Sequence, residues 1–156
     1  MLHLYTYKTI LGPITIGEDD GFITYVGLPG DNPPSNQIWY ENEVLTEAAF
    51  QLWEYLNGKR REFDLPLAPQ GTEFQLQVWT TLQQVPYGET RSYKDIALKI
   101  SNPGAYRAVG QANNRNPIPI FIPCHRVIGS NGKLIGYGGG LELKARLLDL
   151  EKCHYR

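Results

Sequence analysis

A cysteine and a histidine stand side by side in a block of this chain that could carry nucleophilic chemistry. Residues 122–127 read Ile-Pro-Cys-His-Arg-Val and contain one of only two cysteines and one of only three histidines. A thiol attacks as its thiolate, and neighbouring histidine and arginine lower the pKa of a cysteine below its free value of about 8.5. The block therefore indicates a nucleophile at Cys124. The alternative is a buried structural cysteine, because free cysteine commonly packs as a small hydrophobe.

The basic residues are concentrated in the second half of the chain. The net charge is −1, but residues 1–70 contain four Lys/Arg and ten Asp/Glu, whereas residues 71–156 contain eleven and six. The halves therefore carry −6 and +5. Between positions 91 and 133 a single acid, Asp95, accompanies Arg91, Lys94, Lys99, Arg107, Arg115, Arg126 and Lys133. This stretch predicts a phosphate-binding surface, and the alternative is a merely solvated basic face.

The acidic half, residues 1–70, predicts a small sheet with one helix. Short apolar runs bounded by turn residues predict antiparallel strands at Leu2–Lys8, Ile14–Gly17 and Phe22–Leu28. A proline- and asparagine-rich loop, Pro29–Asn36, precedes Glu43–Leu56, where apolar residues recur at helical spacing. That helix should cover one face of the sheet. Pro66–Gly71 is the expected linker to the second half, residues 71–156.

The basic half predicts mostly helices, so the expected fold class is α+β. Thr72 can cap a helix that ends before Pro86-Tyr87-Gly88, and Ser92-x-x-Asp is a capping box for a second, short helix. Ser101–Gly104 is expected to form a tight turn, with Asn102 as a cap and Pro103 at a first helical position.

Another helix follows that turn. Ala105, Ala108, Val109 and Ala112 should form its apolar face, with Tyr106 and Arg107 pointing outward. Two short helices joined by such a turn predict a helix-turn-helix that binds DNA. The alternative is a helical hairpin that binds nothing.

The segment that carries Cys124 is expected to be extended and rigid. Asn116–Cys124 is an apolar run broken by prolines, and Gly136–Gly140 is a glycine-rich loop that would let a flat ligand approach the backbone. A last helix, Leu141–Glu151, ends on a glutamate that could reach back to a histidine. Consecutive side chains of an extended segment point to opposite faces, so Cys124 and His125 should interact through a bridging water.

The composition also limits where the protein works and what it binds. No apolar run approaches the length of a membrane helix and the first residues do not resemble a signal peptide, so a cytoplasmic location without membrane contact is expected. Cys124 and Cys153 should both be free thiols, and Cys153 near the end of the chain is given no role. Residues 1–123 contain no cysteine and only His3, so we predict no metal, and no cofactor is expected either.

These residues together match a known signature. Pro123-Cys-His-Arg-Val-Ile-Gly, preceded by Asn116-Pro and followed by Tyr137-Gly-Gly-Gly-Leu, resembles the active site of the O6-alkylguanine-DNA alkyltransferases, or methylated-DNA–protein-cysteine methyltransferases. Gly88–Tyr93 and Tyr106–Gly110 look like the helix-turn-helix of that family. The resemblance covers most of residues 71–151, and residues 1–70 only in outline.

The resemblance implies a chemical role for five side chains. Cys124 would take the alkyl group from O6 of a damaged guanine, and also from O4-alkylthymine, to give a thioether, so the protein could not turn over. His125 would act as a base through water, and Glu151 would fix its tautomer. Tyr137 would hydrogen-bond the departing guanine oxygen, and Asn116 would brace the segment that carries Cys124.

The resemblance also implies how DNA is bound. The damaged base must leave the duplex, so Arg107 would fill the vacated space, unless it only contacts phosphate, and Tyr93 would crowd the phosphate. The backbone of Val127 and Gly138 would read the base edge, and Tyr106 and Ser130 are further candidate DNA contacts. The partner would be double-stranded DNA containing O6-alkylguanine, bound by a monomer.

Three other functions compete with this interpretation. A non-catalytic alkylation-damage sensor would bind and flag lesions, but such proteins lack the cysteine that this chain has. A cysteine hydrolase would need an oxyanion hole, which no loop pattern indicates. A plain transcriptional regulator would leave the Pro-Cys-His-Arg block unexplained.

Overall fold

The computed structural model describes residues 1–35 and 37–155. The predicted loop Pro29–Asn36 and the predicted second half, residues 71–156, each end on a residue outside that part of the chain. The chain divides into two compact units, Met1–Gln70 and Gly71–Arg156. The α+β fold class expected from the sequence is confirmed.

The first unit contains a four-stranded sheet in the order β3-β2-β1-β4. Strand β1 (Leu2–Thr9) pairs antiparallel with β2 (Gly12–Asp19), and β2 pairs antiparallel with β3 (Phe22–Gly27). The fourth strand, β4 (Gln37–Trp39), was not predicted and pairs with β1 in parallel, so the sheet is mixed. Three residues are too few to show an alternating pattern in the sequence.

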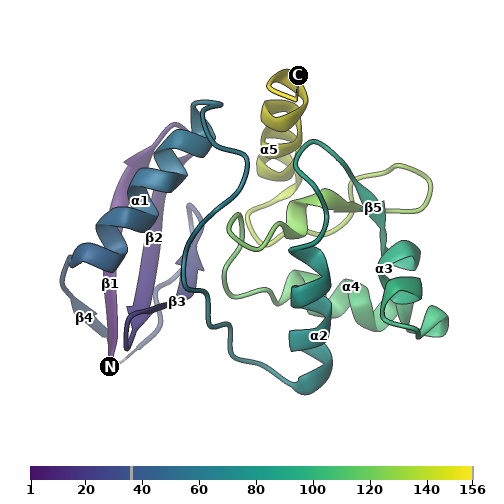
Figure 1. The fold of residues 1–156 in the computed structure, drawn as a ribbon, viewed down its shortest axis with the longest axis horizontal. Helices are drawn as coiled ribbons and strands as arrows, with labels where there is room; N and C mark the ends of the chain where they lie inside the picture. The colour runs from purple at the N-terminus through teal and green to yellow at the C-terminus, as the bar shows by residue number, and fades with distance from the viewer. Residues whose placement is uncertain (36, 156) are drawn as a thin grey trace. The chain divides into compact units, whose positions relative to one another are not determined.

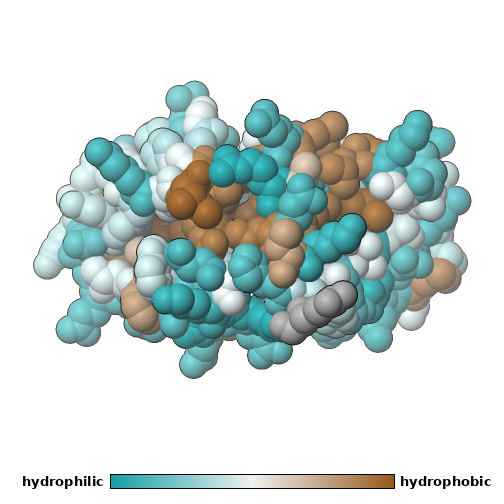
Figure 2. Space-filling view, turned by 90° about the horizontal axis from the view of Figure 1, so that it is seen from above, coloured by the Kyte–Doolittle hydropathy of each residue, from teal (hydrophilic) through white to brown (hydrophobic). Residues whose placement is uncertain are grey.

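Helix α1 (Glu43–Leu56) covers one face of this sheet, with the predicted bounds (Figure 1). The Asn42 side chain caps it by accepting a bond from the backbone N–H of Leu45. The fully buried core between helix and sheet includes Leu4, Ile14, Ile16, Ile23, Leu45 and Ala48. Some large apolar side chains remain exposed, among them Phe50 and Trp53 on α1, and Figure 2 shows hydrophobic residues reaching one face of the protein surface.

The second unit begins with helices that have predicted caps. Helix α2 (Glu73–Leu82) has a reciprocal capping box between Thr72 and Gln75. Helix α3 (Tyr93–Lys99) has one between Ser92 and Asp95. Each pairing satisfies two backbone N–H groups that a helix start leaves without partners.

Helix α4 (Tyr106–Asn114) packs on both α2 and α3, which gives the predicted helical hairpin (Figure 1). A short 3-10 helix, η1 (Pro103–Ala105), precedes it, and the Asn102 side chain makes no capping bond, contrary to the prediction. Val109 and Ala112 are buried as expected, but Ala108 is exposed, because α4 buries a narrower face than its alanines indicate.

The remaining elements surround the cysteine. Every residue from Ile118 to Val127 is buried. This run leads into the 3-10 helix η2 (Cys124–Arg126) and strand β6 (Val127–Ile128), which pairs in parallel with β5 (Arg91–Ser92). That pairing brings the start of α3 next to the cysteine turn. Helix α5 (Leu141–Cys153) completes the unit. In the described part of the chain, no helix is long and apolar enough to cross a membrane.

Candidate active site

Cys124 lies in a tight buried turn. It is 4% exposed and is the first residue of η2. The N–H of Arg126 donates to the Pro123 carbonyl at 3.0 Å, and the N–H of Val127 donates to the carbonyl of Cys124 itself. The prediction of an extended conformation at Cys124 is therefore wrong, because the chain turns back on itself to enter β6. Because the segment is not extended, the alternation of its side chains no longer supports a bridging water between Cys124 and His125.

Two asparagine side chains hold this turn. Asn116 Nδ2 donates to the Ile122 carbonyl at 2.9 Å, and Asn116 Oδ1 accepts from the Ile118 N–H at 3.0 Å. Asn116 thus lies where a brace of the cysteine segment was expected. Asn113 Nδ2, on the inner face of α4, donates to the Cys124 carbonyl at 3.3 Å. The sequence analysis missed Asn113, although its position next to Ala112, on the predicted apolar face of the helix, was a usable signal.

Glu151 on α5 collects the polar groups around the cysteine turn. Its Oε2 lies 2.6 Å from His125 Nε2, and its two oxygens accept from Arg126 Nε and Nη2 at 2.9 and 3.0 Å. The backbone N–H of Gly88 also donates to it at 2.9 Å. Burial alone would raise the pKa of Glu151, but His125 and Arg126 outweigh it and lower the pKa to about 2. The expected His125–Glu151 contact is present.

Arg126 is not part of a basic surface. It is 6% exposed, and besides Glu151 its Nη1 donates to the Val85 carbonyl at 2.8 Å. Inclusion of Arg126 among the phosphate-binding cations was therefore wrong. Its charge is matched by the Glu151 carboxylate, so it cannot act as a free cation beside the thiol.

The neighbouring His125 and Arg126 do not lower the pKa of Cys124 below its free value, as their adjacency in the sequence had suggested. Burial raises the pKa of Cys124 to about 11, although Asn116 and Lys144 act to lower it. Burial also lowers the pKa of His125, against the opposing effect of Glu151. The structure therefore holds a protonated thiol beside a neutral imidazole at pH 7. A base must remove the thiol proton before the sulfur can attack.

A loop joined to α3 and α5 lies near the thiol. The Tyr93 hydroxyl donates to the Ile135 carbonyl at 2.8 Å, and Lys144 Nζ donates to the same carbonyl at 2.9 Å. Burial and the charge of the Cys124 thiolate form raise the pKa of Tyr93, and a hydrogen bond with Asn113 opposes that rise. The prediction included Tyr93 but assigned nothing to Lys144.

The other predicted site residues follow in the chain. Val127 is buried in β6, whereas Gly138 and Ser130 are exposed. Tyr137 is half-buried, and its carbonyl accepts from the Gly140 N–H at 3.0 Å, which shapes the glycine-rich loop. The structure thus brings Cys124, His125, Glu151, Asn116 and Tyr93 into one region and leaves Ser130 on the surface.

The outer face of the helical hairpin carries cations around an aromatic ring. Tyr106 and Arg107 are both exposed at the start of α4. The Arg107 guanidinium carbon lies 5.9 Å from the Tyr106 ring centroid, and Lys94 Nζ from α3 lies 5.5 Å from it. Such cation–π pairs group positive charge at the start of α4. This face suits an anionic backbone.

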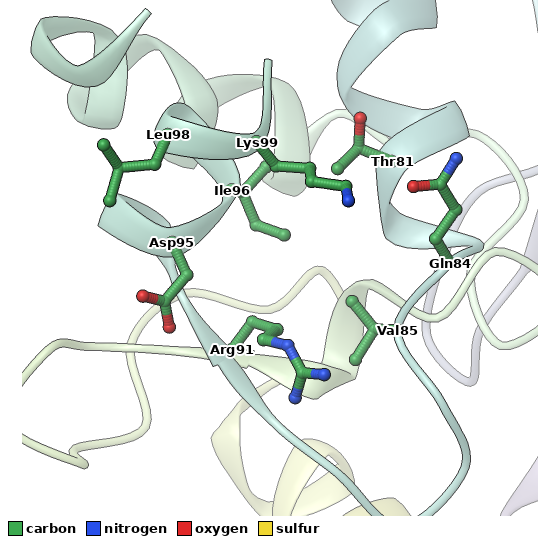
Figure 3. A pocket seen from close by; sticks show the side chains of 8 residues that line it. All are labelled: Thr81, Gln84, Val85, Arg91, Asp95, Ile96, Leu98 and Lys99. Carbon is green, nitrogen blue, oxygen red and sulfur yellow. The ribbon is translucent and has the colours of Figure 1, made fainter. Parts of the chain in front are cut away.

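A separate surface pocket of about 410 Å³ lies between α2 and α3 (Figure 3). Arg91, Asp95 and Lys99 provide its charged groups, and Ile96 and Val85 its apolar floor. None of the predicted site residues lines it, so it is not the site of the cysteine chemistry. In residues 1–35 and 37–155, no three His, Cys, Asp or Glu side chains are grouped so as to hold a metal ion.

Both units match known protein families. Residues 73–153 match the DNA binding domain of 6-O-methylguanine DNA methyltransferase, and residues 2–69 match its ribonuclease-like domain. A methylated-DNA–protein-cysteine methyltransferase of Methanosarcina acetivorans is 51% identical over 148 residues, covering 93% of this chain and 95% of that relative. The constitutive one of Bacillus subtilis is 46% identical and covers 100% of this chain and 99% of the relative.

A solved structure has the same fold as this chain. The crystal structure of a Mycobacterium tuberculosis relative in complex with DNA has a TM-score of 0.93 and 44% identity, covering 97% of this chain and 94% of that one. The fold and the site define a protein with a DNA-binding helical half and a buried cysteine beside a histidine–glutamate pair. The chain belongs to the 6-O-methylguanine DNA methyltransferase family, which confirms the family predicted from the sequence.

Proposed function

We propose that this protein repairs alkylated DNA by moving the alkyl group from O6 of guanine directly to the sulfur of Cys124. The observation that carries the proposal is the buried cysteine turn, in which Cys124 is followed by a histidine whose Nε2 lies 2.6 Å from Glu151 Oε2. The names of the relatives and the DNA complex of one of them support DNA as the partner. O4-alkylthymine would be a second substrate.

The reaction begins with loss of the thiol proton. Nε2 of His125 donates to the ionised Glu151, so Nδ1 is the nitrogen that would take the proton, through a water molecule as the family resemblance implies. The low pKa of His125 keeps this nitrogen able to accept a proton at neutral pH. Glu151 stabilises the imidazolium that results, with Arg126 as a permanent partner.

The transfer is an in-line displacement. The thiolate sulfur forms a bond to the alkyl carbon while the bond from that carbon to O6 breaks, and the electron pair stays on the guanine oxygen. The Tyr137 hydroxyl would donate a hydrogen bond to that oxygen as the charge develops. The products are an S-alkyl cysteine and a guanine anion, which becomes guanine when the proton taken from the thiol is returned to it from His125 through Tyr137. A thioether has no good leaving group, so each molecule would act once.

The helical hairpin would present the damaged base to this site. Base extrusion costs a few kcal/mol, which contacts elsewhere must offset. Arg107 would enter the space that the base vacates, Tyr93 would pack against the neighbouring phosphate, and Tyr106 and Ser130 would contact the backbone. The backbone of Val127 and Gly138 would read the base edge. The Val127 N–H already donates to the Cys124 carbonyl.

Intact-mass measurement tests the proposal. The protein is incubated with an oligonucleotide duplex that contains O6-methylguanine, with the Cys124→Ala variant as control. We expect one added methyl group per molecule, located on Cys124, and no more product than protein. Binding without methyl transfer would instead identify a damage sensor. Many turnovers, or methyl removal by Cys124→Ala, would contradict the proposed mechanism.

A further inference from the structure

Helix α4 places a buried asparagine against the cysteine turn. Asn113 is 1% exposed, and its Nδ2 donates to the Cys124 carbonyl at 3.3 Å. Gly110 lies three residues earlier on the same face of the helix, and a Cβ atom there would be 3.8 Å from the Tyr93 ring. Asn113 therefore lies on the face of α4 that Tyr93 covers, beside the residue that carries the proposed nucleophile.

The contacts of Asn113 fix which way its amide points. The Cys124 carbonyl oxygen can only accept a hydrogen bond, so the amide nitrogen must be the atom that faces it. A hydrogen bond with Asn113 also acts to lower the pKa of Tyr93, against the larger effect of burial. The Tyr93 hydroxyl donates its proton to the Ile135 carbonyl, so Asn113 must be the donor in this contact too. Both hydrogens of Nδ2 are then in use.

The amide oxygen of Asn113 is an acceptor that the surrounding residues do not use. Oδ1 is buried, and no group in residues 1–35 and 37–155 donates a hydrogen bond to it. A buried acceptor without a donor is unfavourable, so its presence in a folded protein needs an explanation. Rotation of the amide would not relieve it, because Oδ1 would then face the Cys124 carbonyl oxygen. The donor that satisfies Oδ1 must come from outside these residues.

An O6-alkylated guanine has one donor that fits this acceptor. Alkylation at O6 removes the proton from N1, so the amino group at C2 is the only donor on the Watson–Crick edge, the edge by which flipped bases are commonly read. Cys124 is 4% exposed, so a base must displace neighbouring atoms to reach its sulfur, and the Asn113 amide is one of those neighbours. A base whose O6-alkyl carbon meets the sulfur therefore brings its amino group to the cysteine turn.

We propose that Asn113 is a specificity-determining residue whose Oδ1 accepts a hydrogen bond from the 2-amino group of the alkylated guanine. This inference rests on the proposed function and names the part of the base that the site recognises. The amino group keeps both of its protons while the S–C bond forms and the bond from carbon to O6 breaks. A base without this group would leave Oδ1 without a donor in the complex, and a hydrogen-bonding site rejects an analogue in this way.

The test compares O6-methylguanine with 6-methoxypurine, which is the same base without its 2-amino group, in one duplex sequence. Single-turnover methyl transfer to Cys124 is measured with saturating protein, so that the rates do not depend on affinity. The two bases pair differently in the duplex, but that difference is the same for every variant, so the ratio of the two rates isolates the side chain. We expect the ratio for the unsubstituted protein to be about tenfold higher than for Asn113→Leu, which corresponds to one hydrogen bond. Gln111→Leu removes an exposed amide from the same helix, and this matched control should keep the full ratio.

A role in holding the cysteine turn alone gives a different result. Asn113→Leu would then slow transfer from both bases by the same factor, and such an unchanged ratio overturns the proposal. If Asn113→Leu does not fold, the unsubstituted protein is given the two bases in single strands, where pairing is absent. About tenfold slower transfer from 6-methoxypurine is expected there, and equal rates overturn the proposal. No transfer from either base by the unsubstituted protein would overturn the proposed function itself, whereas normal transfer with an unchanged ratio counts only against the role of Asn113.

Discussion

Glu151 Oε2 and His125 Nε2 are 2.6 Å apart, and the two side chains are at most 1% exposed. A contact this short between buried groups fixes both the ring orientation of His125 and the nitrogen that can act as a base. The same carboxylate accepts from Arg126 and from the Gly88 backbone. One side chain at the end of α5 therefore joins η2 to the loop before α3. The chemistry of the cysteine and the stability of the unit depend on the same group.

Glu151→Gln should reduce both the stability of the second unit and the rate of methyl transfer. The amide cannot balance the buried Arg126, and removal of one partner of a buried ion pair costs on the order of 3–5 kcal/mol. Urea unfolding should show this loss, and single-turnover methyl transfer should slow by at least about a hundredfold, as expected when a general base loses its support. Asp149→Asn removes an exposed acid from the same helix and is the control. Equal transfer rates for the two variants would argue against the proposed relay.

Stability should fall in acid over a defined range. The pKa of Glu151 is lowered from 4.5 to about 2 on folding, so the stabilisation is complete above about pH 4.5 and is lost as the pH falls toward 2. Unfolding by urea at a series of pH values measures this directly. The Glu151→Gln variant should show a smaller loss between those limits. A parallel pH dependence in both proteins would assign the acid sensitivity to other carboxylates.

Much of this architecture could be predicted from the sequence because it rests on local patterns. The capping boxes at Thr72 and Ser92 and the apolar spacing of α1 are signals within a single turn or face of a helix. Strand β4 and the turn at Cys124 were not predictable in this way, because each depends on a partner distant in sequence. Ile38 and Trp39 acquire a strand conformation from pairing with β1.

The charges around the thiol show the same limit. A sequence places Arg126 beside Cys124, but the fold directs its guanidinium to Glu151 and Val85. Lys144 is twenty positions from the cysteine, yet its charge acts on the thiol. Electrostatic neighbours of a buried group are set by tertiary packing, so adjacency in the chain indicates the nucleophile but not its environment.

Gly88→Ala should destabilise the protein through the Glu151 cluster. Gly88 has φ +79°, and a Cβ atom there would collide with the Tyr155 ring. A side chain at such a φ costs of order 1 kcal/mol or more, and any shift of the loop would weaken the Gly88 N–H bond to Glu151. The melting temperature should fall by several degrees. Gly104→Ala, where a Cβ would meet nothing within 4 Å, should leave it unchanged; a matching drop there would remove the argument.

Asn116→Ala should destabilise the segment that carries Cys124 and lower the reactivity of its thiol. The buried Ile118 N–H would lose the oxygen that it donates to, which costs about 1–3 kcal/mol. The pKa of Cys124 should rise further, because Asn116 now lowers it. Slower reaction with iodoacetamide at pH 8 and a lower urea midpoint are the expected results. Asn102→Ala, which removes an exposed amide without a capping bond, is the control, and an unchanged thiol reactivity in Asn116→Ala would contradict the bracing role.

Arg107→Ala should separate DNA binding from repair. Arg107 is exposed at the start of α4 and lies near the Tyr106 ring, where it could either enter the duplex or contact phosphate. If it fills the space left by the damaged base, its loss lets the base return to the stack, so methyl transfer should slow much more than affinity falls. Fluorescence anisotropy gives the affinity, and quenched single-turnover reactions give the rate. Arg115→Ala removes an equal charge at the other end of α4. Since a phosphate contact contributes only to binding, this variant should lower the affinity modestly and lower the rate at sub-saturating protein by the same factor. The same proportional loss in Arg107→Ala would assign that side chain to the DNA backbone.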